Sequence, residues 1–260
     1  MKDTLKEIIK VKKEKLLLAK QALPEDELKS RLTGLPEARG FTQAIAKPKQ
    51  ISLIAELKKA SPSKGLIRQD FDIAKLAAAY QEAGAQAISV LTEEDFFQGN
   101  LSYLQIARDN ANLPVLRKDF IMEAYQIYES RVFGADAVLL IADILSKDKL
   151  VELMGISKEL GLDCLVEVHD EKELKKVLNL KVPLIGINNR DLHSLEVDFK
   201  ITEKLFPLIP KEKIVVVESG IKTYQDILFL KILGASAVLI GEAIMSSQDV
   251  RQKIEEIMGW

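Results

Sequence analysis

Eight short runs rich in β-branched residues, separated by longer segments with helical patterns, constrain the fold of this sequence more than any other feature. The runs 137–141 and 214–217 contain only apolar residues, as is typical of strands covered on both faces. Alternation of such strands with helices is the pattern of parallel βαβ units. We predict strands at 51–57, 87–91, 114–117, 137–141, 164–168, 184–187, 214–217 and 237–240.

A short repeat distinguishes between the two folds that such units form, a closed barrel and an open doubly wound sheet. Gly84, Gly134 and Gly234 each stand three residues before a predicted strand, where a glycine serves as a helix C-cap. The same turn before the second, fourth and eighth strands indicates one repeating unit, and eight such units form a TIM barrel. The sequence lacks the G-x-G-x-x-G and Walker motifs of many doubly wound sheets. We therefore predict an α/β fold, a (β/α)8 TIM barrel with an N-terminal helical extension.

The chain is long enough to bury one large core, so we expect a single TIM-barrel domain over residues 1–260, in which 1–48 form the extension packed on the barrel. Apolar residues at mostly helical spacings predict an amphipathic helix in the extension: Leu5, Ile8, Ile9, Leu16 and Leu17. A helix lying on a membrane surface is the alternative. The segment mixes acidic with basic residues and does not resemble a signal peptide. We also expect no second enzyme fused after Trp260.

Charge and cysteine content narrow the partners and the compartment. The 37 basic and 39 acidic residues nearly cancel, which disfavours nucleic acid and membrane partners and favours a small-molecule substrate. The single cysteine, Cys164, permits no intramolecular disulfide and is typical of a reducing compartment. We expect a cytoplasmic protein that is a monomer or a weak homo-oligomer.

Polar residues follow several of the predicted strands, where catalytic groups of TIM barrels project. Strand side chains alternate in direction, so Glu56 and Lys58 can share the inward side of the barrel, but the direction of Glu218 stays open. One such carboxylate alone would be interpreted as half of an ion pair. Several converging glutamates and lysines are costly to bury for structure alone, so together they predict an acid–base site. These strand-end residues are Glu56, Lys58, Lys118, Glu167, Asn188, Arg190 and Glu218.

Three further features concern binding. Ser219 and Gly220 follow the seventh strand, and Gly241 and Glu242 follow the eighth, where TIM barrels commonly bind phosphate. The polar loop 61–65 is either an ordinary turn or a lid over substrate. The aromatic residues just past the second and third strands are either loop packing or the wall of a pocket for an aromatic ring: Phe96, Phe97 and Phe120.

Two other chemistries are disfavoured. His169 and His193 lie far apart in the sequence, without cysteine or carboxylate at metal-ligand spacing, so we expect no metal site. Ser219-Gly220 lacks the G-x-S-x-G context of a nucleophilic serine.

These segments together resemble the indole-3-glycerol phosphate synthase family. Segment 56–65 is similar to that family's first-strand signature, and the extension before the first strand is similar to its N-terminal addition. Further blocks follow in the family's order at 91–99, 117–121, 165–168, 185–192, 218–221 and 239–242. The resemblance covers essentially the whole chain. It implies a carboxy-lyase of tryptophan biosynthesis that needs no cofactor and closes 1-(2-carboxyphenylamino)-1-deoxyribulose 5-phosphate to indole-3-glycerol phosphate, releasing carbon dioxide and water.

The resemblance also implies catalytic roles. Lys118 matches the general acid that neutralises the oxyanion during ring closure. Glu167 and Lys58 correspond to the base and the acid of the dehydration, with the division of the acid roles between the two lysines left open. The remaining active-site positions would orient the lysines and the sugar hydroxyls: Glu56, Asn188 and Glu218.

The resemblance further implies how the substrate is bound. Arg190 would fork onto its carboxylate. Phe97 and Phe120 would flank the anthranilate ring, with Ser61 in the mobile first loop beside it. Glu242 would turn its amide rather than its carboxylate to the ligand. The phosphate would be surrounded by Lys58, Ser219, Gly220, Gly241 and Glu242.

Two alternatives remain from the residues. A barrel resembling phosphoribosylanthranilate isomerase would be expected to carry a cysteine at the end of its first strand, where this sequence has the segment Glu56 to Lys58. A non-catalytic phosphate-binding barrel would bind the ligand without turnover, which the set of acid–base residues argues against.

Overall fold

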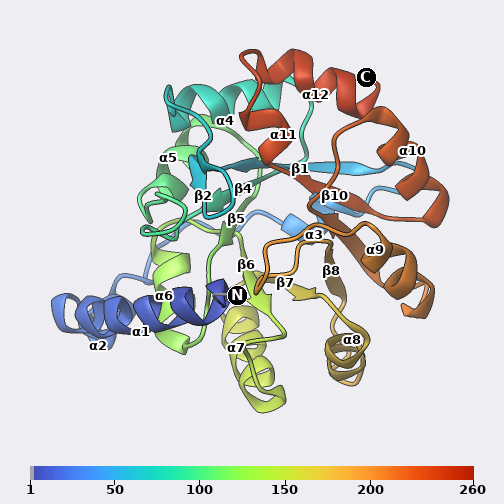
Figure 1. The fold of residues 1–260 in the computed structure, drawn as a ribbon. Coiled ribbons are helices and arrows are strands. Elements are labelled where there is room, and N and C mark those ends of the chain that lie inside the picture. The colour runs from blue at the N-terminus through green and yellow to red at the C-terminus, as the bar shows by residue number, and fades with distance from the viewer. Residues whose placement is uncertain (1–2) are drawn as a thin grey trace.

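The computed structural model describes residues 3–260 and contains a closed barrel of eight parallel strands ringed by helices (Figure 1). Around the barrel the strands lie in the order β1-β10-β9-β8-β7-β6-β5-β4. This confirms the predicted (β/α)8 barrel. The strands are β1 (Ser52–Leu57), β4 (Ala87–Leu91), β5 (Val115–Lys118), β6 (Ala137–Ile141), β7 (Asp163–Val168), β8 (Leu184–Asn188), β9 (Ile214–Glu218) and β10 (Ala237–Ile240).

Three strands extend one residue beyond the predicted apolar runs, and the added residues are polar. β5 ends at Lys118, β8 at Asn188 and β9 at Glu218. Their backbones still pair in register, with Lys118 opposite Leu91 and Asn188 opposite Glu218. Strand pairing uses backbone groups, so it continues past the last apolar side chain. The barrel therefore holds these polar side chains rigidly.

Helices connect the strands and cover the outside of the barrel (Figure 1). Gly84, Gly134 and Gly234 have φ angles of 83°, 86° and 99°, as expected for residues that end helices in the left-handed conformation. The main helices after the strands are α4 (Ile73–Glu82), α5 (Tyr103–Asn110), α6 (Ala124–Val132), α7 (Lys147–Glu159), α8 (Glu171–Leu178), α9 (Lys200–Leu205), α10 (Tyr224–Leu233), α11 (Glu242–Met245) and α12 (Val250–Met258), with one 3-10 turn, η1 (Phe206–Leu208).

The interior of the barrel is a packed core rather than a pore. Apolar side chains from the strands fill it, including Ile54, Leu116 and Leu165, which are all fully buried. Phe41 of α3 (Phe41–Ile45) joins this cluster, and so does Ile8 of the N-terminal helix. The extension therefore contributes to the same core as the strands.

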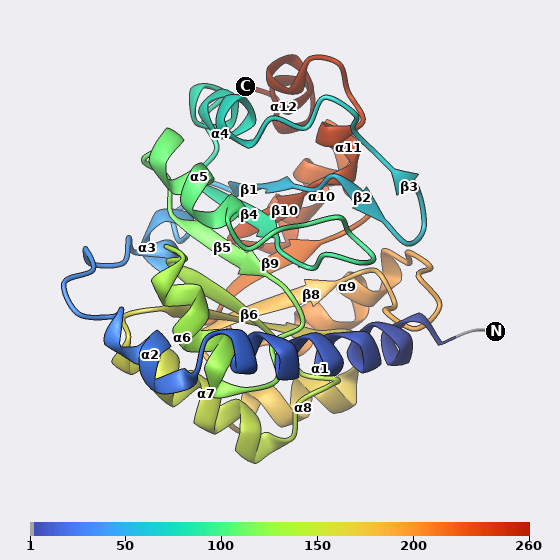
Figure 2. The same cartoon turned by 90° about the vertical axis from the view of Figure 1, so that its left-hand side faces the viewer.

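The N-terminal extension forms α1 (Thr4–Ala22) and α2 (Glu25–Ser30), and α1 crosses the barrel beside α6 (Figure 2). Leu16 packs in one cluster with Tyr125 of α6, which confirms an amphipathic helix lying on the barrel. Leu17 does not share the buried face of this helix, because the residue is 63% exposed. One residue further along a helix turns the side chain by about 100°, which takes Leu17 off the buried face.

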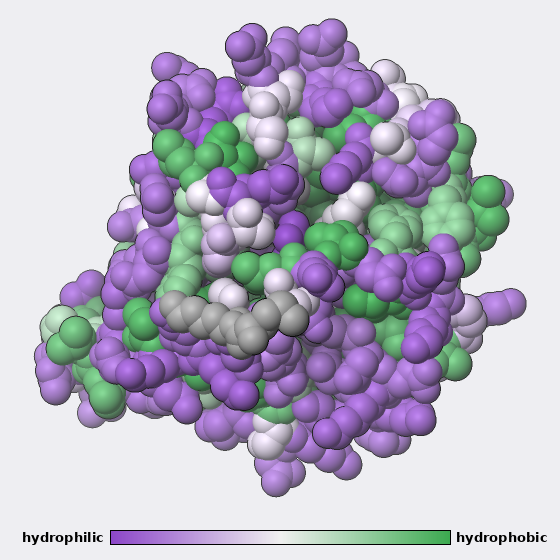
Figure 3. Space-filling view, viewed as in Figure 1, coloured by the Kyte–Doolittle hydropathy of each residue, from purple (hydrophilic) through white to green (hydrophobic). Residues whose placement is uncertain are grey.

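The face seen in Figure 3 is mostly hydrophilic, with hydrophobic residues exposed over α10. Within residues 3–260, none of the helices combines the length and the apolar character that a membrane crossing needs.

Candidate active site

A cavity of about 590 Å³ opens at the C-terminal ends of the strands. All residues that the sequence analysis named individually for catalysis or binding line it except Phe96, and Ile8 of α1 lines it too. A cavity of this size suits a small-molecule ligand. The selected residues are Glu56, Lys58, Ser61, Phe97, Lys118, Phe120, Glu167, Asn188, Arg190, Glu218, Ser219, Gly220, Gly241 and Glu242.

Lys118, at the end of β5, contacts two carboxylates from two other strands of the barrel. Its ammonium donates a hydrogen bond of 3.1 Å to Glu167 Oε2 on β7 and forms an ion pair of 3.2 Å with Glu218 Oε2 on β9. Burial alone would lower the pKa of Lys118, but the charges of Glu167 and Glu218 outweigh it and raise that pKa above its ordinary value. Lys118 therefore stays protonated around neutral pH. The contact also settles the direction of Glu218, which faces the cavity.

The two carboxylates differ in protonation. Burial raises the pKa of Glu218 to about 8, and the neighbouring Glu167 adds to this, although Lys118 opposes it. Burial acts in the same direction on Glu167, but Lys118 and His169 outweigh it and hold the Glu167 pKa well below its usual range. Around neutral pH the site thus holds an ammonium, a carboxylate and a carboxylic acid. Such a set can both donate and accept protons.

Two glycines make room for the carboxylates. A Cβ at Gly186 of β8 would lie 2.6 Å from Glu218 Oε1, and a Cβ at Gly241 would overlap Glu56 Oε1. The sequence analysis assigned Gly241 only a phosphate role and did not select Gly186. The position of Gly186 within an otherwise apolar run could have indicated its role, because a glycine inside a strand often marks the close approach of another group.

Glu56 and Lys58, from the end of β1, both face the cavity and form an ion pair of 2.8 Å. This agrees with the alternation of strand side chains. Behind them, the buried hydroxyl of Tyr80 on α4 donates a 3.0 Å hydrogen bond to the backbone oxygen of Glu56. On the opposite side, Asn188 Oδ1 accepts a 3.0 Å hydrogen bond from the backbone N–H of Arg190 and so shapes the loop after β8.

The cavity mouth contains a cluster of charges. Arg190 Nη2 lies 3.1 Å from Glu242 Oε2, and its Nη1 donates to the backbone oxygen of Leu195 at 2.9 Å and to Ser63 Oγ at 3.4 Å. Lys64 Nζ lies 3.7 Å from the other oxygen of Glu242. The Glu242 carboxylate thus pairs with two cations at the mouth. Glu242 is also the first residue of the short helix α11.

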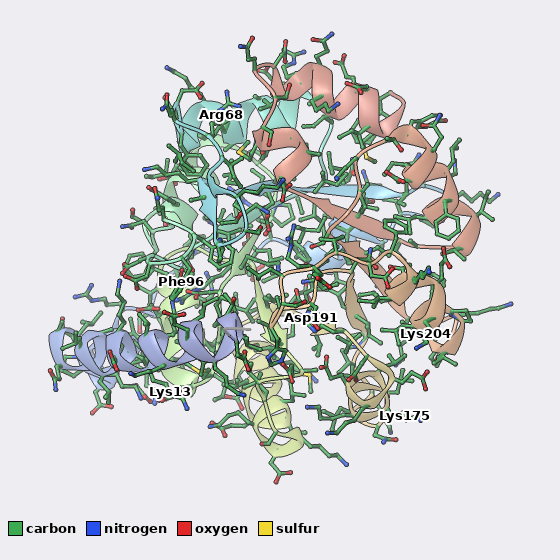
Figure 4. The ribbon with its side chains drawn as sticks, viewed as in Figure 1. Lys13, Arg68, Phe96, Lys175, Asp191 and Lys204 are labelled. Atoms are coloured by element: carbon green, nitrogen blue, oxygen red, sulfur yellow. The ribbon has the colours of Figure 1, made fainter. Side chains whose placement is uncertain are left out.

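The loop after β1 is more ordered than an ordinary turn. It forms an antiparallel ribbon of β2 (Ala60–Ser61) and β3 (Gly65–Leu66), and Ser61 is buried. Arg68 follows this ribbon and donates hydrogen bonds to backbone oxygens of Met245 and Ser247, which tie it to the end of α11 (Figure 4).

Aromatic rings form another part of the wall. The ring centroids of Phe97 and Phe120 lie 6.3 Å apart, and both side chains face the cavity. Glu93 accepts hydrogen bonds from the backbone N–H groups of Phe96 and Phe97, which fixes the loop after β4. For Phe97 and Phe120 this favours the pocket-wall interpretation over plain loop packing.

Two groups beside the site were missed by the sequence analysis. His169 Nε2 lies 3.4 Å from Glu167 Oε1, and the spacing argument above concerned the histidines only as metal ligands. Asp119, next to Lys118, pairs with Lys12 of α1 at 2.7 Å and with Arg117 at 3.0 Å. The pair of Lys12 and Asp119 joins segments 107 positions apart, so spacing gave no signal for it. Glu167 and His169 are only two positions apart, so strand alternation was a signal for their contact. Among residues 3–260, no group of three or more His, Cys, Asp or Glu side chains is placed to hold a metal ion.

Comparisons with known proteins agree with this site. The sequence profile of the family described as "Indole-3-glycerol phosphate synthase" matches residues 5–257. An indole-3-glycerol phosphate synthase of Alkaliphilus metalliredigens is 47% identical over 253 residues, covering 97% of each chain. One of Acetivibrio thermocellus is 51% identical over 228 residues, covering 88% of each.

The solved structure of 3-hexulose-6-phosphate synthase from Salmonella typhimurium has a TM-score of 0.63 and 15% identity, covering 80% of this chain and 97% of that one. At this identity the likeness concerns the fold alone. The family profile and the two sequence relatives carry the assignment, because both extend over nearly the whole barrel and its extension. This chain belongs to the indole-3-glycerol phosphate synthase family.

Proposed function

We propose that this enzyme closes 1-(2-carboxyphenylamino)-1-deoxyribulose 5-phosphate to indole-3-glycerol phosphate, with loss of carbon dioxide and water, in tryptophan biosynthesis. One observation carries this assignment beyond family membership: Lys118 lies between Glu167 and Glu218, whose pKa values are shifted in opposite directions. The reaction needs a proton donor first and a base with an acid afterwards, and the cluster can supply these forms.

In the first step, a ring carbon of the substrate attacks the ribulose carbonyl and a carbon–carbon bond forms. The carbonyl oxygen becomes negative and takes a proton from Lys118, which is a cation in the resting site. The carboxyl group then leaves as carbon dioxide, and its bonding electrons restore the aromatic ring.

In the second step, the intermediate loses water. Glu167 is ionised in the resting site and accepts the proton, while Lys58 protonates the departing hydroxyl. Glu56 lies 2.8 Å from Lys58 and orients its ammonium. Asn188 and Glu218 position the sugar hydroxyls and Lys118.

The cavity suits the three parts of the substrate. The anthranilate ring packs against Phe97 and Phe120, beside Ser61. Arg190 binds the carboxylate with its planar guanidinium once its pairing with Glu242 is exchanged.

The phosphate binds at the opposite side of the cavity. Lys58 supplies charge there, and the loops after β9 and β10 supply backbone N–H groups from Ser219, Gly220, Gly241 and Glu242. Ser219 and Gly220 have φ angles of 65° and 83°, a conformation that can turn successive N–H groups toward an anion.

The remaining expectations belong to the same proposal. The enzyme uses no metal or cofactor, acts as one domain over residues 1–260 and works in the cytoplasm as a monomer or weak homo-oligomer, without nucleic acid or membrane partners. The near-balance of charge and the single cysteine support this.

The cysteine also argues against the isomerase alternative. Cys164 lies on β7 and packs with the layer between sheet and helices, and burial raises its pKa to about 11. It is therefore remote from the end of β1, where that chemistry would need it.

The test is to supply the carboxyphenylamino ribulose phosphate and to follow indole absorbance and fluorescence. We expect product to form when the protein is present at a concentration far below that of the substrate. Turnover of phosphoribosylanthranilate instead would identify the isomerase alternative, and tight binding of the ribulose phosphate without product would identify a non-catalytic barrel.

A further inference from the structure

His169 follows β7 directly and lies between two carboxylates. Its Nε2 is 3.4 Å from Glu167 Oε1, and its Nδ1 is 3.3 Å from Glu173 Oε2 in the first turn of α8. The backbone N–H of His169 also donates a 2.8 Å hydrogen bond to Glu173 Oε2, so this one carboxylate fixes both the backbone and the ring. His169 is thus held from behind by α8 and directed at the site.

The contact with Glu167 occurs between two otherwise unpartnered atoms. Within residues 3–260, neither Glu167 Oε1 nor His169 Nε2 has a hydrogen bond of regular geometry, and both atoms are buried. Buried polar atoms of this kind are costly unless they pair. The two atoms face each other. When the imidazole of His169 is protonated, its positive charge attracts the negative charge of Glu167, and the contact is favourable.

Protonation of His169 agrees with its surroundings. Burial alone would lower its pKa, but Glu167 and Glu173 outweigh burial and raise the His169 pKa to about 10. Beyond Glu167, the next charged groups facing the pair are Lys118 on β5 and Glu218 on β9.

The two carboxylates around Lys118 therefore have unequal support. Glu167 contacts two cations, Lys118 through Oε2 and His169 through Oε1. Among the described residues, Glu218 has only Lys118 within ion-pair distance. Two carboxylates that share one lysine in a buried site compete for a proton, and the one with the second cation stays ionised.

We infer that His169, held by Glu173, is a positioning residue that keeps Glu167 ionised and aimed, so that Glu167 serves as the base and Glu218 retains the proton. This role rests on the proposed function, in which Glu167 accepts the proton of the dehydration. His169 acts through Glu167 and needs no contact with substrate.

The first test needs no substrate. The chain has two histidines, so imidazole NMR gives two titrating rings, and the variant His193→Asn assigns them. His193 lies at the surface, with a side chain 46% exposed. We expect His169 to titrate well above 6.5 and its pKa to fall in Glu173→Gln. A His169 pKa at or below 6.5 would overturn the inference whatever the enzyme's activity.

The second test is the pH profile of kcat/KM. In His169→Gln, which keeps a donor but loses the charge, the acid limb should move to higher pH by about one unit or more, because Glu167 loses a cation partner. In His169→Ala, which also loses the positioning contact, kcat should fall a further roughly tenfold to hundredfold. His193→Asn should keep the wild-type profile.

The outcomes separate the two claims. Absence of turnover in folded wild-type protein would reject the proposed function and leave the NMR test of His169 intact. Normal wild-type turnover with unshifted acid limbs in both His169 variants would overturn this inference alone. If the His169→Ala variant fails to fold, the pH profile of His169→Gln still tests the inference, because glutamine has a volume similar to that of histidine.

Discussion

The ammonium of Lys118 lies 3.1 Å from the carboxylate of Glu167, although the two residues are 49 positions apart in the sequence. Neighbouring strands β5, β6 and β7 carry them to the same end of the barrel. The pair is largely buried, so each charge strongly stabilises the other. Their contact defines where acid–base chemistry occurs, and the residues around it yield the predictions below.

Glu218→Gln should change the pH dependence of stability. The pKa of Glu218 is raised from 4.5 to about 8 in the folded protein, so the wild type loses stability as pH rises from about 4.5 to about 8. Glutamine is a neutral substitute for the protonated acid. We expect the variant to unfold at similar denaturant concentration at pH 4 but to be more stable than wild type by a few kcal/mol at pH 9. Equal stabilities at pH 9 would show that Glu218 is not buried as an acid.

Gly186→Ala should disturb the site from behind. The added Cβ would lie 2.6 Å from Glu218 Oε1 and push that side chain against Lys118. We expect a loss of about 1–3 kcal/mol in unfolding free energy, with a marked fall in kcat. The matched control is Gly155→Ala in α7, where a Cβ meets nothing within 4 Å. That variant should be up to about 1 kcal/mol more stable, with normal kcat. Similar behaviour of the two variants would refute the steric explanation.

Glu242→Gln should lower KM. The Glu242 carboxylate lies 3.1 Å from Arg190, which the substrate carboxylate must engage. Removing the competing charge frees Arg190, and we expect KM to fall by roughly threefold to tenfold, as for a partly exposed ion pair. Arg190→Lys should raise KM instead, because lysine cannot form the forked contact. A higher KM in Glu242→Gln would mean that Glu242 supports binding.

Lys12→Met should weaken the link between the extension and the site. Lys12 of α1 lies 2.7 Å from the buried Asp119, beside Lys118. Lys12 and Arg117 lower the pKa of Asp119 against the effect of burial. Removing Lys12 leaves a buried carboxylate with one fewer cation, so stability should fall by about 3 kcal/mol, most clearly above the ordinary pKa of aspartate. The exposed variant Lys6→Met serves as the control in urea unfolding, and an equal effect of both would count against a specific link.

Much of the barrel was predictable from the sequence, because its strands are apolar on both faces and their helices end in recurring glycines. The runs 87–91, 137–141 and 237–240 match the strands residue for residue. The strands ending in Lys118, Asn188 and Glu218 were cut one residue short, since an apolar run stops before strand pairing does.

The site was predictable in position but less so in its contacts. The selected residues except Phe96 line one cavity, because strand ends of a barrel converge. His169 and Glu167 are two positions apart at the end of β7, so strand alternation was a signal for their contact. The direction of Glu218 and the space provided by Gly186 depend on which strands become neighbours and how side chains fit between them. Periodicity within one segment carries no information about such contacts.

The central claim is that Lys118 donates the first proton in a site where Glu167 and Glu218 hold it. The most direct measurement compares formation of indole-3-glycerol phosphate by wild type and Lys118→Ala at saturating substrate, with binding of the substrate measured in parallel. We predict a loss of about 10²-fold to 10⁴-fold in kcat, with binding largely retained. Near-normal turnover by a folded Lys118→Ala variant would contradict the claim.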